Sequence, residues 1–138
     1  MTYLLDTNVV SELRRGPRAD RGVLEWFEAR EADELALSVV TIGEIRQGLE
    51  QLRRRDRPQA ELLDRWLRGL TQFYGDRLLD IDGDVTDEWG RLRAGRGVPV
   101  IDALLAATAR VRGLTLVTRN VRDFAGLHVR LLSPFSGA

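Results

Sequence analysis

Acidic and amide side chains stand at five points of this chain where an apolar stretch meets a turn or begins a helix. These positions are Asp6, Glu44, Asp102, Asn120 and Asp123. Carboxylates lose hydration near a core and repel one another, so a fold that gathers several of them requires a cation to offset their charge. The pattern therefore predicts a divalent metal site and, through the metal, chemistry on phosphate groups.

Each of these positions also has a local explanation. Asp6 follows an apolar run and could cap a helix, and Asp102 could simply suit the dipole of a helix in whose first turn it lies. Thr41-x-x-Glu44 matches a capping box, which predicts a helix that begins at Thr41. The two late residues could shape a loop after a strand. None of these explanations predicts that all five side chains face one edge of the fold, as the metal-site hypothesis does.

Composition excludes several other classes of site. The 138 residues fit a single domain over 1–138, and 43% hydrophobic with 30% charged residues is typical of a soluble globular protein. The chain has no cysteine, no apolar run long enough to span a membrane and no secretory signal, which favours a cytoplasmic protein. All 21 cations are arginine, so Schiff-base and phosphate-loop lysine chemistry is excluded. Because the formal net charge is zero, a nucleic acid would have to bind at a local basic patch.

The periodicity of apolar residues predicts strands that alternate with helices. The expected strands cover 3–5, 34–40, 78–81, 114–118 and 128–131. The expected helices cover 9–15, 21–30, 41–55, 59–73, a segment capped by Asp82 or Asp84, and a segment from Pro99 to Gly113. The helices between 42 and 73 carry more leucine and tryptophan than a small sheet needs, which suggests a groove for a partner or a dimer contact.

Short apolar strands separated by helices indicate an α/β fold, a parallel sheet of about five strands with helices on both faces. In such sheets ligands bind beyond the carboxyl ends of the strands, where the connections diverge. Asp6 and Asn120 each lie just past a predicted strand. We therefore expect them at one edge of the sheet.

Four segments of the chain together resemble a known family. They read LLDTNVVSE, VVTIGEIRQGL, VIDALLAATARVRGL and TLVTRNVRDF. In this order and spacing they are similar to PIN-domain ribonucleases, specifically VapC-type toxins of toxin–antitoxin pairs, with a leaning to the FitB-like branch, and the likeness runs from Met1 to about Pro134. The resemblance implies a PIN-like three-layer sandwich, Mg²⁺- or Mn²⁺-dependent cleavage of RNA, a homodimer and inhibition by a VapB-type antitoxin.

The resemblance also assigns roles by position. Asp6, Glu44 and Asp102 match the three acids of the family, and Thr7, Asn8 and Thr118 match polar residues that support the site. The chain departs from the family at Asn120, where an aspartate is common, and Asp123 is the nearest acid that could replace the missing charge.

A mechanism follows from these assignments as a hypothesis. Asp6 and Asp102 would bind the metal directly, while Glu44 and Asp123 would hold metal-bound waters or a second ion. One such water would attack the phosphorus in line. Arg119 and Arg122 are the arginines nearest to the acids in the sequence and would contact the phosphates of the RNA.

Three other classes compete with this hypothesis. A catalytically weak PIN-like module that binds RNA or protein is compatible with Asn120. Receiver domains and haloacid-dehalogenase-type phosphatases use an aspartyl nucleophile, but they usually need a lysine, and the phosphatases need an aspartate where Asn8 stands. Dinucleotide binding is excluded because the chain has no G-x-G-x-x-G segment.

Overall fold

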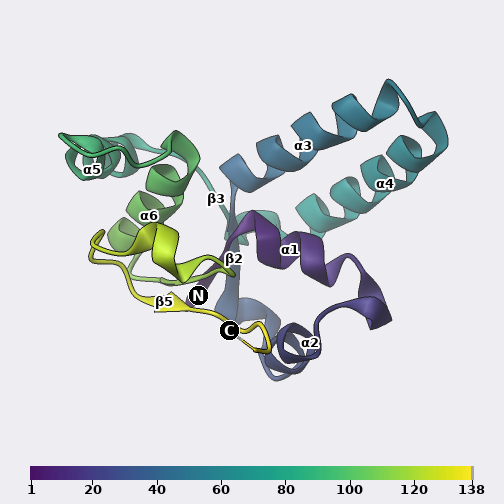
Figure 1. Ribbon diagram of the computed structural model, residues 1–138, viewed down its shortest axis with the longest axis horizontal. Helices are drawn as coiled ribbons and strands as arrows, with labels where there is room; N and C mark the ends of the chain where they lie inside the picture. The colour runs from purple at the N-terminus through teal and green to yellow at the C-terminus, as the bar shows by residue number, and fades with distance from the viewer. Residues whose placement is uncertain (138) are drawn as a thin grey trace.

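Five short parallel strands form one sheet in the order β3-β2-β1-β4-β5 (Figure 1). They were located in a computed structural model that describes residues 1–137. The strands are β1 (Tyr3–Leu5), β2 (Leu35–Ser38), β3 (Leu78–Leu79), β4 (Thr115–Val117) and β5 (Leu131–Leu132). In the central strand, Leu4 pairs with Ala36 on one side and with Leu116 on the other. The chain thus leaves β1 in one direction and later returns to its other side, which makes the β1/β4 boundary the switch point of the sheet.

Six α-helices and four 3₁₀ segments connect the strands within the described residues. The helices are α1 (Thr7–Leu13), α2 (Arg21–Glu28), α3 (Val39–Arg53), α4 (Arg57–Tyr74), α5 (Gly83–Arg93) and α6 (Val100–Arg112). The 3₁₀ segments are η1 (Gly16–Arg18), η2 (Ala32–Glu34), η3 (Gly75–Arg77) and η4 (Val121–Phe124). None of the helices within residues 1–137 is both long and apolar enough to cross a membrane.

The core lies in two layers, one on each face of the sheet. Leu4 packs into a cluster that includes Leu105 of α6 and Val85 of α5. Its neighbour Leu5 points to the opposite face and joins Leu49 of α3 and residues of the other early helices. Alternate strand residues therefore bury opposite faces, as the pleat requires. Figure 1 shows α5 and α6 on one side and α1 to α4 on the other, which confirms the predicted three-layer α/β architecture.

The predicted capping box at Thr41 and Glu44 is wrong. Helix α3 begins two residues earlier, at Val39, and its N-cap is Ser38, whose hydroxyl accepts a hydrogen bond from the Val40 backbone N–H at 3.0 Å. Because Ser38 caps the helix, Thr41 lies inside it and not at its end. The side chain of Thr41 is fully buried. The carboxylate of Glu44 is therefore not used for capping.

The last strand is shorter than predicted and starts later. His128 is exposed and has a φ of 55°, and the nearby Gly126 has a φ of 82°. This left-handed backbone cannot continue an extended strand, so only Leu131–Leu132 pair with β4. The remaining element boundaries differ from the predicted ones by a few residues.

Candidate active site

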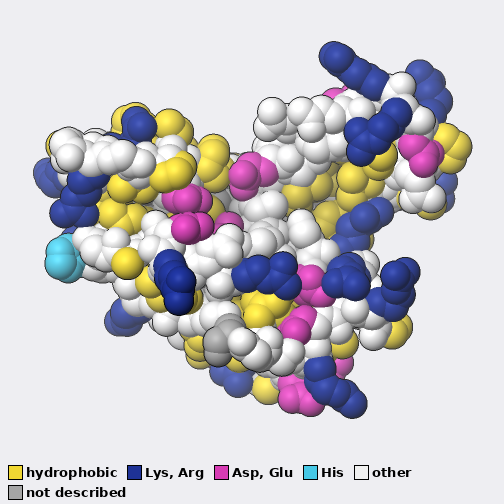
Figure 2. Space-filling model, viewed as in Figure 1, with side chains coloured by type: hydrophobic (Ala, Val, Ile, Leu, Met, Phe, Trp, Pro, Cys, Tyr) yellow, Lys and Arg dark blue, Asp and Glu magenta, His cyan; other side chains and the backbone are white. Residues whose placement is uncertain are grey.

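A cavity of about 540 Å³ opens at the carboxyl edge of the sheet, next to the β1/β4 switch point. Four of the five predicted site residues line it: Asp6, Glu44, Asp102 and Asn120. Thr7, Asn8, Ser11, Glu12, Arg15, Ile101 and Arg119 complete its wall. Figure 2 shows acidic side chains gathered in the hollow between the α5–α6 side and the α3–α4 hairpin, with arginine side chains beside them.

Asp6 is held in place as the residue that joins β1 to α1. Its backbone N–H donates to the carbonyl of Val117 in β4 at 2.9 Å, which continues the sheet pairing by one residue. Its Oδ1 accepts from the backbone N–H of Thr7 at 2.7 Å, so Asp6 is the N-cap of α1. Capping occupies Oδ1, while Oδ2 accepts hydrogen bonds from other partners, Thr118 and Asn8.

The hydroxyl of Thr118 organises the residues around that second oxygen. Thr118 is completely buried at the end of β4 and donates to Asp6 Oδ2 at 2.8 Å. The Nδ2 of Asn8 lies 3.3 Å from the same oxygen and 3.4 Å from the Thr118 hydroxyl, which also accepts from the backbone N–H of Asn120 at 3.1 Å. Thr118 and Asn8 therefore fix the orientation of the Asp6 carboxylate.

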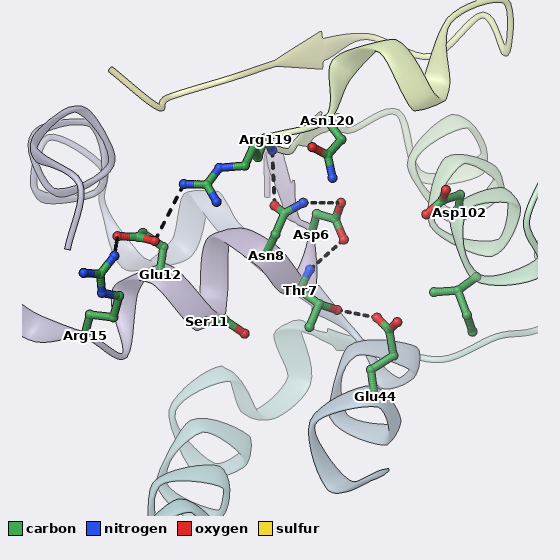
Figure 3. Close-up of a pocket in the computed structure, with 11 residues that line it drawn as sticks. Asp6, Thr7, Asn8, Ser11, Glu12, Arg15, Glu44, Asp102, Arg119 and Asn120 are labelled. Carbon is green, nitrogen blue, oxygen red and sulfur yellow. Dashed lines mark hydrogen bonds and ion pairs between the residues drawn. The ribbon is translucent and has the colours of Figure 1, made fainter. Parts of the chain in front are cut away.

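Glu44 reaches the cavity from the first turns of α3. Its Oε1 accepts a hydrogen bond from the Thr7 hydroxyl at 2.5 Å, and the Thr7 hydroxyl lies 3.2 Å from that of Thr41. A carboxylate can only accept, so the Thr7 proton goes to Glu44 and the Thr41 hydroxyl is left to donate to Thr7. These contacts tie α1 to α3, and Figure 3 shows the one between Thr7 and Glu44.

Asp102 enters from the other side, in the first turn of α6. Figure 3 shows it across the cavity from Glu12. The neighbouring side chain of Ala103, like those of Ala106 and Ala107, is fully buried, so this helix packs closely on the sheet. Within residues 1–137 the Asp102 carboxylate accepts no hydrogen bond and joins no ion pair.

The carboxylates of the cavity act on one another electrostatically. Burial raises the pKa of Asp6 above its ordinary value, hydrogen bonds from Thr118 and Thr7 oppose that rise, and repulsion by Glu44 adds to it. Burial also raises the pKa of Asp102, and repulsion by Asp6, Asp123 and Glu44 adds to the effect. The negative charges of this cavity are therefore close enough to disfavour one another.

Three of the predicted residues do not line the cavity: Thr118, Arg122 and Asp123. Thr118 is buried and bonded to Asp6. Asp123 and Arg122 are exposed in η4, beyond the end of β4. Asp123 nevertheless contributes to the raised pKa of Asp102, so its negative charge acts electrostatically on a carboxylate of the cavity. Arg119, in contrast, lines the cavity as predicted.

Sequence reasoning missed part of the wall that α1 and the turn after it provide. Asn8, Ser11, Glu12 and Arg15 all line the cavity. Asn8, Ser11 and Glu12 are spaced by three and four residues on one face of α1, and Arg15 lies two residues beyond its last residue, Leu13. This spacing after Asp6 was the signal that would have added Ser11, Glu12 and Arg15 to the candidate residues.

The donor atoms fit a hydrated divalent cation better than a closed metal cage. No group of three or more acids and histidines within residues 1–137 is gathered tightly enough to enclose an ion. The cavity does offer carboxylate oxygens, and Asp6, Glu44 and Asp102 form no ion pair with any arginine of the described chain. Mg²⁺ keeps several waters and typically takes one or two protein carboxylates, which suits this arrangement.

Comparison with known proteins places the chain in a family. The model of the PIN domain matches residues 3–127. VapC ribonuclease Y4jK of Sinorhizobium fredii is 32% identical, and the match covers 98% of this chain and 99% of that protein. Plasmid stability protein StbB of Pseudomonas syringae pv. tomato is 33% identical, and the match covers 96% of this chain and 97% of that protein. The crystal structure of FitAcB from Neisseria gonorrhoeae matches with a TM-score of 0.87 at 28% identity, over 96% of this chain and 98% of that one.

These matches span nearly the whole chain, including the four segments singled out in the sequence. The likeness to FitB was expected from the same segments and is confirmed at the level of the fold. The chain therefore belongs to the PIN-domain family, within its VapC-type branch.

Proposed function

We propose that this protein is an endoribonuclease that hydrolyses phosphodiester bonds of RNA with the help of Mg²⁺ or Mn²⁺, and that it is the toxin of a toxin–antitoxin pair. The observation that carries the proposal is the meeting of Asp6, Glu44 and Asp102 at one cavity of a VapC-type fold, although they are far apart in the sequence. The relative from S. fredii is named a VapC ribonuclease and its similarity covers 98% of this chain, which supports RNA as the substrate.

The chain's own residues would divide the work at the metal. Asp6 and Asp102 would bind the cation directly, and Glu44 would hold one of its waters, with Asp123 at the outer edge. A cation bound here would lower the pKa of a coordinated water and stabilise charge on the phosphoryl oxygens. Thr118 and Thr7 keep the carboxylates of Asp6 and Glu44 oriented through hydrogen bonds of 2.8 and 2.5 Å.

Asn120 would have a neutral role at the rim of the same cavity. Its backbone N–H is held by Thr118, and its side chain is exposed to the solvent of the cavity. An amide can orient a water molecule through its carbonyl oxygen but adds no charge. The cation would therefore be bound by fewer negative groups than in relatives with an aspartate at this position.

The partner of this toxin is a VapB-type antitoxin, as expected for a VapC-type protein. A second cavity, of about 350 Å³ and largely apolar, lies between α1, α2 and α4, where Trp66, Leu70 and Phe73 contribute to its wall. We assign this groove to an apolar segment of the antitoxin, and we propose that the toxin itself is a homodimer that acts on RNA in the cytoplasm. Sedimentation at micromolar concentration would test the dimer, since a strict monomer contradicts it.

Cleavage of RNA by the purified protein tests the proposed function. We expect cleavage with Mg²⁺ or Mn²⁺, none with a chelator, and products that carry a 5′-phosphate. Asp6→Asn and Asp102→Asn should each lower kcat by a factor of at least about 10³, because each removes a charged ligand of the metal that would stabilise the reacting phosphate. The thermal transition of each variant is the control for folding.

The same protein samples distinguish the nuclease from a PIN-like module that binds RNA without cutting it. If calorimetry detects no uptake of Mg²⁺ or Mn²⁺ while RNA binds tightly, the protein is a PIN-like RNA-binding module and the nuclease proposal is wrong. Undiminished cleavage by rigorously purified Asp6→Asn would also overturn it, since the activity would then come from elsewhere.

A further inference from the structure

A buried carboxylate stands beside the candidate site without any part in the mechanism above. Glu12 of α1 is only 6% exposed and lines the same cavity as Asp6. Its Oε2 accepts from the backbone N–H of Asp20 at 2.7 Å and from Arg15 Nη1 at 3.0 Å. Its Oε1 lies 3.9 Å from Nη2 of Arg119. One buried acid thus holds two arginines that reach it from different parts of the chain.

Arg119 is held on two further sides. Its guanidinium lies over the ring of Phe135, 4.1 Å from the ring centroid, and its backbone N–H donates to Asn8 Oδ1 at 3.2 Å. Phe135 is itself buried, so it forms a fixed platform for the guanidinium. The position of Arg119 is therefore set by Glu12, Phe135 and Asn8 together.

Both arginines keep donors free for a ligand. The side chains of Arg15 and Arg119 are 53% and 54% exposed, and both line the cavity. A guanidinium has five N–H donors, and Glu12 engages only part of them. Two cations around one carboxylate leave one net positive charge at this end of the cavity, while Asp6, Glu44 and Asp102 make the other end negative (Figure 3).

We propose that Arg15 and Arg119 bind a backbone phosphate of the RNA next to the bond that is cut, and that Glu12 is a positioning residue that holds both arginines for this contact. The proposal rests on the proposed nuclease function and names the contact that orients its substrate. A phosphodiester carries the negative charge that this end of the cavity matches, and guanidinium groups bind phosphate through paired hydrogen bonds. The polarity of the cavity then sets on which side of the metal site the strand continues.

Whether Glu12→Gln raises or lowers the affinity for RNA distinguishes a residue that positions the arginines from one that only neutralises their charge. Glutamine can still accept the hydrogen bond from Asp20 but no longer pairs with the arginines as an anion. If Glu12 only neutralised positive charge, its removal would make the site more positive and RNA would bind more tightly. If it positions the arginines, RNA binds more weakly although the protein has lost a negative charge.

The test is the binding of a fluorescein-labelled single-stranded RNA oligonucleotide, measured by anisotropy in chelator over a range of salt concentrations. We expect Arg15→Gln and Arg119→Gln each to weaken binding about tenfold and to reduce the slope of log K against log salt by about 0.7, the value for one phosphate contact on a single strand. Glu12→Gln should also weaken binding. Arg130→Gln is the matched control, because Arg130 lies at the start of β5, at the opposite edge of the sheet.

The outcomes of this test differ from those of the cleavage assay. Equal binding and equal salt slopes in wild type, Arg15→Gln and Arg119→Gln overturn the phosphate contact and leave the nuclease function standing if cleavage persists. Tighter binding by Glu12→Gln overturns the positioning role. Weakened binding in these variants, with no metal-dependent cleavage by the wild type, supports the phosphate contact while the nuclease function fails. Thermal transitions of all variants exclude unfolding as the cause.

Discussion

The hydroxyl of Thr7 donates to the carboxylate of Glu44 at 2.5 Å and so joins the first turn of α1 to α3 across 37 positions of the sequence. The residue before Thr7 is Asp6, whose carboxylate accepts the Thr7 backbone N–H. Thr7 thus contacts two of the cavity acids at once, Asp6 through its backbone and Glu44 through its side chain. The relative placement of Asp6 and Glu44 depends on this residue.

Replacement of Thr7 by valine should therefore impair catalysis without removing any charge. We expect kcat for RNA cleavage to fall by about 10- to 100-fold, the usual cost of removing a residue that orients a metal ligand, and KM to change little. Thr7→Ser keeps the hydroxyl and should retain most of the activity. Steady-state kinetics of the two variants in Mg²⁺ would check this, and a Thr7→Val enzyme as fast as the Thr7→Ser enzyme contradicts it.

The sequence predicted the positions of the acids better than their contacts. Asp6 and Asn120 were correctly expected at one sheet edge, because strand ends in a parallel sheet meet there. Glu44 lines the same cavity, but its capping-box explanation failed because Ser38 caps the helix first. The contact between Glu44 and Thr7 depends on the packing of α3 against α1, which no local pattern encodes.

Long-range contacts also explain why Glu12 was missed. The burial of Glu12 depends on Asp20 and Arg15 in the turn after α1 and on Arg119 from the far end of the chain. In the sequence alone, an acid beside basic residues on a short helix is typical of a solvated face. The late start of β5 has a local cause instead, the left-handed backbone of His128, a conformation that a non-glycine residue rarely adopts.

The raised pKa of Asp102 gives a pH dependence to the stability of the metal-free protein. Burial and repulsion by other acids raise this pKa above its ordinary 3.8, so the folded state binds the proton more tightly than the unfolded state. The free energy of unfolding contributed by this group is therefore greatest below pH 3.8, falls as pH rises through the folded pKa, and stays lower at neutral pH.

Asp102→Asn should remove this loss of folding stability at neutral pH. At pH 7 in chelator we expect the melting temperature to rise by about 2–5 °C, since the neutral amide relieves repulsion in a small domain. The gain should vanish under acidic conditions, where the wild-type carboxyl is protonated. Scanning calorimetry across this pH range is the measurement, and a lower melting temperature for Asp102→Asn at pH 7 is the contrary result.

Asn120→Asp should strengthen metal binding and lower the stability of the metal-free protein. The new carboxylate would line the cavity that already contains Asp6 and Glu44, so it adds an anionic oxygen donor and also adds repulsion when no metal is present. We expect Mn²⁺ to bind about tenfold more tightly by calorimetry, because one extra charge acts at short range. Asn120→Ala is the control for loss of the amide, and equal Mn²⁺ affinity of the aspartate variant and the wild type would exclude a metal near this position.

The contact between α2 and the C-terminal segment should tolerate no side chain at Gly22. A Cβ there would lie 2.4 Å from the carbonyl oxygen of Pro134 and 2.8 Å from the backbone nitrogen of Ser136, and backbone atoms cannot move aside cheaply. We expect Gly22→Ala to destabilise the protein by about 1–3 kcal/mol in chemical denaturation. Because Phe135 lies in the displaced segment and supports Arg119, RNA binding should weaken as well.

Gly48→Ala is the matched control for this substitution. Gly48 lies in the exposed middle of α3, and a Cβ there meets no atom within 4 Å. Alanine should therefore stabilise the helix by about 0.5–1 kcal/mol, because it reduces the conformational freedom of the unfolded chain, and RNA binding should not change. If the two variants shifted the denaturation midpoint in the same direction, the close packing of the C-terminal segment on α2 would be refuted.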